Sequence, residues 1–192
     1  MKTKTITVYS FDELSERAKK VAIEECRPME NFWASENQES IKKLVDILPV
    51  FVNWRNGTAN TEIDLTGQRL ANYIWNNFRK DIYKPKQYWI CNGVKNCVGK
   101  NSKKRDSKVF LFDEYACSLT GYYMDNYVLS PIFEFMRKPE NISLSDLIER
   151  CISEYKKQSE ADWDFQNSDE QIIETIKSNE YTFTESGKLE NI

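Results

Sequence analysis

The sequence predicts an α+β fold, with a small, mainly antiparallel sheet covered by four to six helices. Three observations predict it. Short runs of β-branched and aromatic residues alternate as strands do. Longer runs place apolar residues at the helical period, and glycine, asparagine and proline separate the two kinds of run. Because the strands are short and interleave irregularly with the helices, antiparallel pairing is favoured.

Length and composition indicate one core. The chain has 192 residues, of which 40% are hydrophobic and 13% aromatic, enough to bury a sizeable interior. We predict a single domain of residues 1–192, with a basic loop or hairpin inserted at about residues 79–108. No apolar run approaches the ~20 residues of a membrane span, and the N-terminus lacks a signal-peptide stretch. We therefore expect a soluble, cytoplasmic protein with no membrane partner.

The chain contains no histidine, and this excludes the Ser-His-Asp, Cys-His and two-histidine ribonuclease mechanisms. A catalyst would have to use carboxylates, lysine, tyrosine, cysteine or a hard metal, and no spacing singles out such a set. The cysteines are five and include no C-x-x-C pair, so we expect reduced structural thiols. They are Cys26, Cys91, Cys97, Cys117 and Cys151. The sequence predicts no metal and no cofactor, and it assigns no catalytic residue.

The N-terminal part predicts a strand followed by two helices. Residues 3–9 alternate as a strand, and residues 10–13 have the spacing of a capping box that begins a helix ending before Pro28. A second helix is expected from about residues 31–35 to Pro49.

A hairpin and a third helix follow. Residues 50–54 and 59–65 read as two strands joined by a tight turn at Asn56-Gly57. The third helix is predicted to begin at Thr66-Gly67. Its apolar stripe consists of Leu70, Tyr73, Ile74 and Phe78.

The most apolar and aromatic stretch spans residues 109–139, and we expect the core to form around it. Residues 109–113 predict a buried strand, Thr120-Gly121 breaks the run, and a helix over residues 127–136 stops at Pro139. The side chains expected to be buried are Phe110, Phe112, Ile132, Phe135, Leu147 and Cys151.

The C-terminal third is acidic. From Glu140 onward there are thirteen acidic and five basic residues, a net charge of −8. A helix is expected from Ser143 to about Phe165, another after Ser168, and a short strand over 181–184. A group of carboxylates suggests either a metal or nucleic-acid-mimicking surface, or ordinary helix-start residues, which we favour. The group is Glu160, Asp162, Asp164, Asp169 and Glu170.

Residues 79–108 have the opposite charge. They contain ten basic and two acidic residues, a net charge of +8 on a chain of net charge −3. A cationic loop beside Tyr88 and Trp89 suits phosphate attraction and base stacking, although charge runs are also common on solvated loops. The candidate nucleic-acid-binding residues are Lys95, Lys100, Lys103, Lys104, Arg105 and Lys108.

Three segments carry a resemblance to a known family: YSFDELSERAKKVAIEECR at 9–27, CSLTGYYMDNYVLSPIFEFMRKP at 117–139, and SDEQIIETIKSNEYTFTESGKL at 168–189. Together they resemble small proteins of phages, prophages and plasmids of low-GC Gram-positive bacteria. Relatives of this kind include anti-CRISPR proteins that disable Cas9, one mode of which involves loss or truncation of its guide RNA. The stretch 95–108 is not part of the recurring pattern.

The resemblance implies a shared fold and a mobile-element anti-defence protein whose partners are Cas9, its guide RNA or both. Two modes of action stay open: binding of the Cas9-guide RNA assembly, or histidine-independent cleavage of the guide RNA. Because some family members carry antitoxin labels, an antitoxin-like or accessory interaction module without enzymatic activity is the alternative. Oligomeric state is not predicted.

Overall fold

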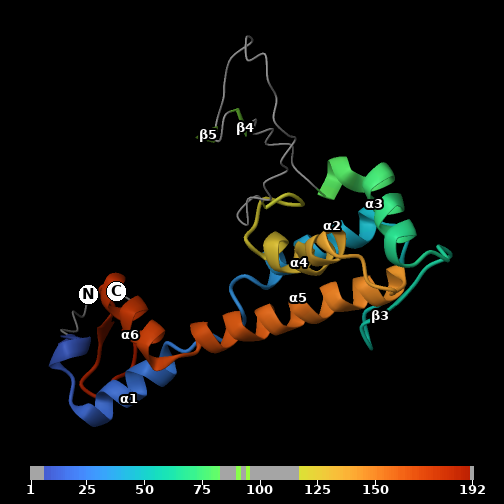
Figure 1. The fold of residues 1–192 in the computed structure, drawn as a ribbon. Coiled ribbons are helices and arrows are strands. Elements are labelled where there is room, and N and C mark those ends of the chain that lie inside the picture. The colour runs from blue at the N-terminus through green and yellow to red at the C-terminus, as the bar shows by residue number, and fades with distance from the viewer. Residues whose placement is uncertain (1–6, 83–89, 92–93, 96–116, 191–192) are drawn as a thin grey trace, which may run out of the picture. The chain divides into compact units, whose positions relative to one another are not determined.

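The computed structural model describes residues 7–82, 90–91, 94–95 and 117–190. Over these residues the chain forms six α-helices and short antiparallel strand pairs, which confirms the α+β class (Figure 1). Contacts divide the chain into two compact units, residues 1–34 with 159–192 (unit 1) and residues 35–158 (unit 2). The expected single domain with an insertion at about residues 79–108 stays a prediction.

Unit 1 is assembled from both ends of the chain. Strand β1 (Tyr9–Ser10) pairs antiparallel with β6 (Thr182–Phe183), and helix α1 (Glu16–Glu25) contacts α6 (Asp169–Ser178). The Phe11 and Phe183 rings meet edge to face, with centroids 6.4 Å apart. The buried apolar residues of this core are Phe11, Leu14, Ala18, Ala22, Ile172, Ile176 and Phe183.

Serine caps decide where the helices of unit 1 begin. The backbone N–H and hydroxyl of Ser10 each donate to the Glu13 carboxylate at 2.8 Å, so the expected capping interaction forms. It closes only a single 3-10 turn, Phe11–Glu13, because Leu14 is extended and buried in the core. Helix α1 instead begins after Ser15 and α6 after Ser168, as predicted for α6, with each hydroxyl accepting an N–H three residues on.

Unit 2 is a continuous stretch of chain built mainly from helices α2 (Ala34–Ile47), α3 (Gly67–Ile82) and α4 (Met124–Arg137), and from α5 (Leu144–Gln166) as far as residue 158, after which α5 belongs to unit 1. Side chains of all four helices form one buried cluster. The cluster contains four side chains expected to be buried, namely Ile132, Phe135, Leu147 and Cys151, whereas Phe110 and Phe112 lie outside the described residues. Burial raises the pKa of the Cys151 thiol, as expected for a structural cysteine.

The predicted hairpin of unit 2 is present. Strands β2 (Phe51–Asn53) and β3 (Thr58–Asn60) pair antiparallel, and Gly57 supplies the left-handed turn at φ 72°. The returning strand is shorter than the expected residues 59–65. After Asn60 the chain is held by side chains instead, since the Thr61 hydroxyl donates to the Pro49 carbonyl at 2.7 Å.

The strands of the described chain form three separate two-stranded pairs, β1 with β6, β2 with β3, and β4 (Ile90–Cys91) with β5 (Val94–Lys95). They do not join into one sheet. Of the expected strand at 3–9, residues 3–6 lie outside the described residues and Tyr9 belongs to β1, while the expected strand at 109–113 lies wholly outside them. None of the helices in the described ranges is both long and apolar enough to cross a membrane.

Candidate interaction surfaces

Most of the predicted nucleic-acid-binding residues are outside the part of the chain that the structure describes. Lys95 ends strand β5, and Lys100, Lys103, Lys104, Arg105 and Lys108 fall in the undescribed range 96–116. The prediction that these six residues form one binding surface therefore stays a prediction.

The beginning of the basic stretch is described at the end of α3. Arg79 and Lys80 are exposed in its last turn, where the helix dipole favours positive charge. The Arg79 guanidinium carbon lies 5.8 Å from the centre of the Trp75 ring, a cation–π distance. Two cations of the predicted basic stretch are thus fixed on a folded helix.

The two ends of the undescribed segment meet. Ile82 is the last residue of α3, and its carbonyl accepts a 2.6 Å hydrogen bond from the Ser118 hydroxyl in a buried position. The chain that leaves α3 therefore returns to the same point 36 residues later. Because Ile82 and Ser118 are already in contact, a change of length between them should cost little loop-closure entropy.

Asp125 in the first turn of α4 organises the returning chain. Its Oδ2 accepts the backbone N–H groups of Leu119, Thr120 and Gly121 at 2.9, 2.8 and 3.0 Å, and its Oδ1 accepts the Thr120 hydroxyl at 2.8 Å. The side chain is fully buried. All four of these donors belong to residues 119–121, so the buried Asp125 carboxylate holds this turn against the start of α4. Its role is therefore structural.

The acidic residues singled out from the sequence occupy different environments. Glu160 and Asp164 are exposed, Asp162 is buried, and Asp169 and Glu170 lie in the first turn of α6. Among the described residues no group of three or more cysteine, aspartate or glutamate side chains is arranged to hold a metal ion. The position of Asp169 and Glu170 at a helix start favours the ordinary dipole role for these two.

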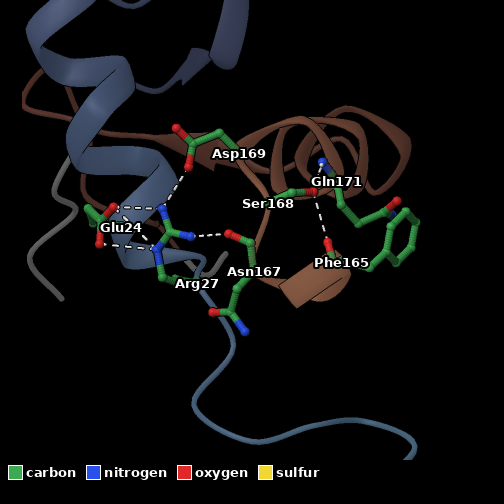
Figure 2. A network of polar contacts seen from close by, with 7 residues as sticks. All are labelled: Glu24, Arg27, Phe165, Asn167, Ser168, Asp169 and Gln171. Atoms are coloured by element: carbon green, nitrogen blue, oxygen red, sulfur yellow. Dashed lines mark hydrogen bonds and ion pairs between the residues drawn. The ribbon is translucent and has the colours of Figure 1, made fainter. Parts of the chain in front are cut away.

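Arg27 joins the end of α1 to the start of α6 (Figure 2). Its guanidinium donates to both Glu24 oxygens and, at 2.7 Å, to Asp169, and it also donates to the Asn167 carbonyl. The hydrogen bonds that Arg27 donates to Glu24 and Asp169 raise the pKa of Arg27, and the hydrogen bond from the guanidinium lowers the pKa of Glu24. Arg27 is thereby engaged by the protein itself.

Unit 1 also contains a groove of about 330 Å³ whose walls are mainly apolar. Its walls come from the α1–α2 connection, the end of α5, α6 and the C-terminal strand region. The lining side chains include Pro28, Phe32, Phe165, Ile172, Tyr181 and Leu189, and we call this surface the unit 1 groove. Phe32 is 71% exposed and Phe165 55% exposed, so two aromatic rings of the lining face solvent.

The backbone that carries Phe32 is held in place. Gln166, only 5% exposed, accepts the Phe32 N–H at 2.8 Å through its Oε1 and donates to the Asn31 side chain at 2.9 Å. The Asn31 amide donates in turn to the Ser159 carbonyl at 3.2 Å. The exposed Phe32 ring is thus attached to a main chain that hydrogen bonds hold in place.

Sequence reasoning missed this groove, although a signal was present. The chain just after Pro28 carries Met29, Phe32 and Trp33, three large apolar residues at or before the expected start of the second helix. Such residues outside any helical or strand period indicate either an extra core contact or a binding surface. That Phe165 lies beside them could not be deduced from the sequence, because more than 130 residues separate the two segments.

Comparisons of the chain with protein families, with curated proteins and with solved structures find no match.

Proposed function

We propose that the chain is an anti-defence protein of a mobile element that inhibits Cas9 by binding the Cas9-guide RNA assembly. The resemblance of segments 9–27, 117–139 and 168–189 supports the class of function. The observation that carries the mode of action is the charge of residues 79–108, which hold ten basic and two acidic residues, and the hydrogen bond between Ser118 and Ile82 joins the residues on either side of 83–117. Ten of the nineteen basic residues of unit 2 belong to residues 79–108.

The physical basis of binding is electrostatic. Lysine and arginine that neutralise phosphates release condensed counterions, and this favours association with any RNA strand. Arg79 and Lys80 lie at the exposed end of α3, where the stretch begins. In Cas9 the guide RNA lies in a positively charged channel and is recognised through its backbone and shape. A second cationic segment can compete with that channel for the RNA phosphates.

The first experiment incubates the full chain with labelled guide RNA, with and without Cas9, and follows RNA length and target cleavage. Intact RNA with blocked cleavage is expected. Shortened RNA would contradict binding as the mode of action and would assign guide RNA cleavage instead.

A charge variant tests which residues act. The change combines Lys100→Gln, Lys103→Gln, Lys104→Gln and Arg105→Gln. We expect weaker binding and weaker inhibition, with the log–log salt slope falling by about 0.7 for each phosphate that the variant no longer neutralises. The matched control removes four exposed cations from unit 2 outside the stretch: Lys42→Gln, Lys43→Gln, Arg55→Gln and Arg69→Gln. If both variants inhibit as the parent does, the basic stretch is a solvated loop.

Because Ile82 and Ser118 are in contact, the residues between them can be deleted, which is a stronger test than the charge variant. Replacing residues 84–115 with a short glycine-serine linker spares Ile82, Ser118 and Asp125, so unit 2 should keep its helical spectrum and cooperative melting. Inhibition should be lost. Retained inhibition with retained folding would exclude the stretch from function.

The second candidate is an antitoxin-like or accessory interaction module, favoured by the acidic excess of unit 1, which has fifteen acidic and eight basic residues. It predicts no effect on guide RNA or on Cas9 cleavage, and the first experiment separates the two.

A further inference from the structure

The unit 1 groove concentrates exposed aromatic side chains. Phe32, Trp33, Phe165 and Tyr181 all line it and are between 37% and 71% exposed. Aromatic residues are enriched where proteins associate, so a groove lined by exposed aromatic rings is a candidate binding surface. The core of unit 1 does not use these rings, since its buried cluster consists of other residues.

The groove is preorganised. Gln166 fixes the backbone of Phe32, and Arg27 fixes the start of α6, which contributes Ile172 to the wall. Aromatic side chains have few rotatable bonds, so a ring on a fixed backbone loses little entropy when a partner covers it. This arrangement suits an anchor-binding pocket.

Unit 1, the unit that contains the groove, is strongly negative. Described residues of unit 1 include fifteen acidic and six basic side chains, and three of the six are engaged in ion pairs within unit 1: Lys19, Arg27 and Lys177. Several exposed carboxylates adjoin lining residues along the chain. They are Glu25, Asp164, Glu170, Glu174 and Glu180.

We propose that the unit 1 groove docks a basic peptide segment of a partner protein, in which one or two large apolar side chains are flanked by lysine or arginine. The apolar side chains enter between Phe32 and Phe165, and the flanking cations pair with the exposed carboxylates that adjoin the lining residues along the chain. The net negative charge of unit 1 disfavours a nucleic acid. A second copy is disfavoured because two surfaces of equal negative charge repel.

The inference goes beyond the proposed function, because it does not involve residues 79–108. The chemistry of the partner is defined by the two features together, an apolar anchor and positive flanks. Neither feature alone suffices, since general electrostatic attraction would not depend on single aromatic rings.

The test uses the full chain and a fluorescein-labelled synthetic peptide in which one tryptophan and two leucines are flanked by lysines. We expect saturable binding in fluorescence anisotropy, weakened about tenfold by Phe32→Ala or Phe165→Ala. Phe51→Ala is the matched control, since Phe51 is 75% exposed on β2 of unit 2, and it should bind as the parent does. A peptide with glutamate in place of lysine should bind at least tenfold more weakly.

A measurement on the parent protein avoids dependence on variants. A nitroxide on the tryptophan-containing peptide should broaden the amide resonances of Phe32, Phe165 and Tyr181 more than those of β2. The variant lacking four charges at 100, 103, 104 and 105 should bind the peptide unchanged, which separates failure of this inference from failure of the proposed function.

Three results would overturn the inference: equal affinity of Phe32→Ala and the parent, equal affinity for the acidic peptide, or absence of saturable binding. A dimer in sedimentation that Phe32→Ala dissociates would also overturn it, by assigning the groove to a second copy.

Discussion

The two units of this chain differ in whether they are formed by one continuous segment or by two distant segments. Unit 2 is one continuous stretch, residues 35–158, whereas unit 1 combines residues from both ends. In the described residues the buried apolar cluster of unit 2 has nineteen members and that of unit 1 has seven. Unit 1 therefore has fewer buried side chains, and it must also offset the entropy of bringing its two distant chain segments together.

Connectivity makes the dependence one-sided. If unit 2 unfolds, the two halves of unit 1 are joined by 124 flexible residues, and closing such a loop costs on the order of 4 kcal/mol. A folded unit 2 fixes the ends of that loop beforehand. We infer that unit 1 depends on unit 2 for its stability, while unit 2 can persist without unit 1.

Charge separates the units in the same way. Unit 1 has fifteen acidic and eight basic residues, a net charge of −7, and unit 2 has fifteen acidic and nineteen basic ones, a net charge of +4. One chain thus presents surfaces suited to partners of opposite charge, and each proposal above uses one of them.

The largest expected effect comes from core truncation in each unit. Phe135→Ala and Phe183→Ala remove rings that are 3% and 0% exposed, and each should cost about 3 to 5 kcal/mol. Phe183→Ala should broaden or shift the methyl resonance of Ile176 and leave that of Ile148 unchanged. Phe135→Ala should affect both, because unit 1 depends on unit 2.

Phe51→Ala is the control, since a ring 75% exposed should change stability by no more than about 0.5 kcal/mol. The one-sided dependence is refuted if Phe183→Ala destabilises Ile148 as strongly as Ile176.

A glycine pair sharpens the comparison at smaller scale. Gly187 in unit 1 has φ 86°, and a Cβ there would lie 2.1 Å from the Ala18 carbonyl oxygen. Gly121 in unit 2 has φ 99° and nothing within 4 Å. Gly121→Ala should cost about 1 to 2 kcal/mol for the left-handed backbone alone. Gly187→Ala should cost clearly more, because backbone must shift.

Urea unfolding with the same two methyl reporters measures the effect. If the two substitutions lower the free energy of unfolding equally, the turn near Gly187 can move away from Ala18 at little cost.

The smallest expected effect is on pH dependence. Hydrogen bonds from the Ser10 backbone and hydroxyl lower the pKa of Glu13 in unit 1, and those from the Ser143 hydroxyl and backbone lower the pKa of Asp146 in unit 2. A carboxyl with a lowered pKa in the folded state stabilises above its unfolded pKa. That stabilisation is lost as pH falls through the folded pKa, below about pH 4.

Glu13→Gln should therefore weaken the acid dependence of the Ile176 reporter, and Asp146→Asn that of the Ile148 reporter, in urea titrations at pH 6 and pH 3.5. Ser10→Ala, which keeps the backbone donor, should have a partial effect. If the acid dependence is unchanged in both carboxyl variants, the Ser10–Glu13 and Ser143–Asp146 hydrogen bonds are not the source of the acid dependence.

Local chemistry let the sequence predict much of the fold. The cap at Ser168, the turn at Asn56-Gly57 and the apolar periods of α2 to α6 were identified because each depends on residues within a few positions of one another. The same holds for the burial of Leu147 and Cys151 on one face of α5.

Where local signals competed, packing decided. The capping box at Ser10 is real, yet α1 begins after Ser15, because burial of Leu14 in the core of unit 1 interrupts the helix. The returning strand of the hairpin was predicted too long because a side chain takes over its hydrogen bonds after Asn60: the Thr61 hydroxyl donates to the Pro49 carbonyl and accepts the Ile63 N–H.

By itself the sequence determined the α+β class, the helix positions and the charge contrast between residues 79–108 and the C-terminal third, since composition and short-range spacing are read directly along the chain. Only the tertiary structure decided that Ile82 meets Ser118, that Arg27 joins Asp169, and that Gln166 holds Phe32 beside Phe165. Those contacts join residues 36 to 142 positions apart, and at such separations partners are selected by the packing of whole elements, which leaves no pattern in the local sequence.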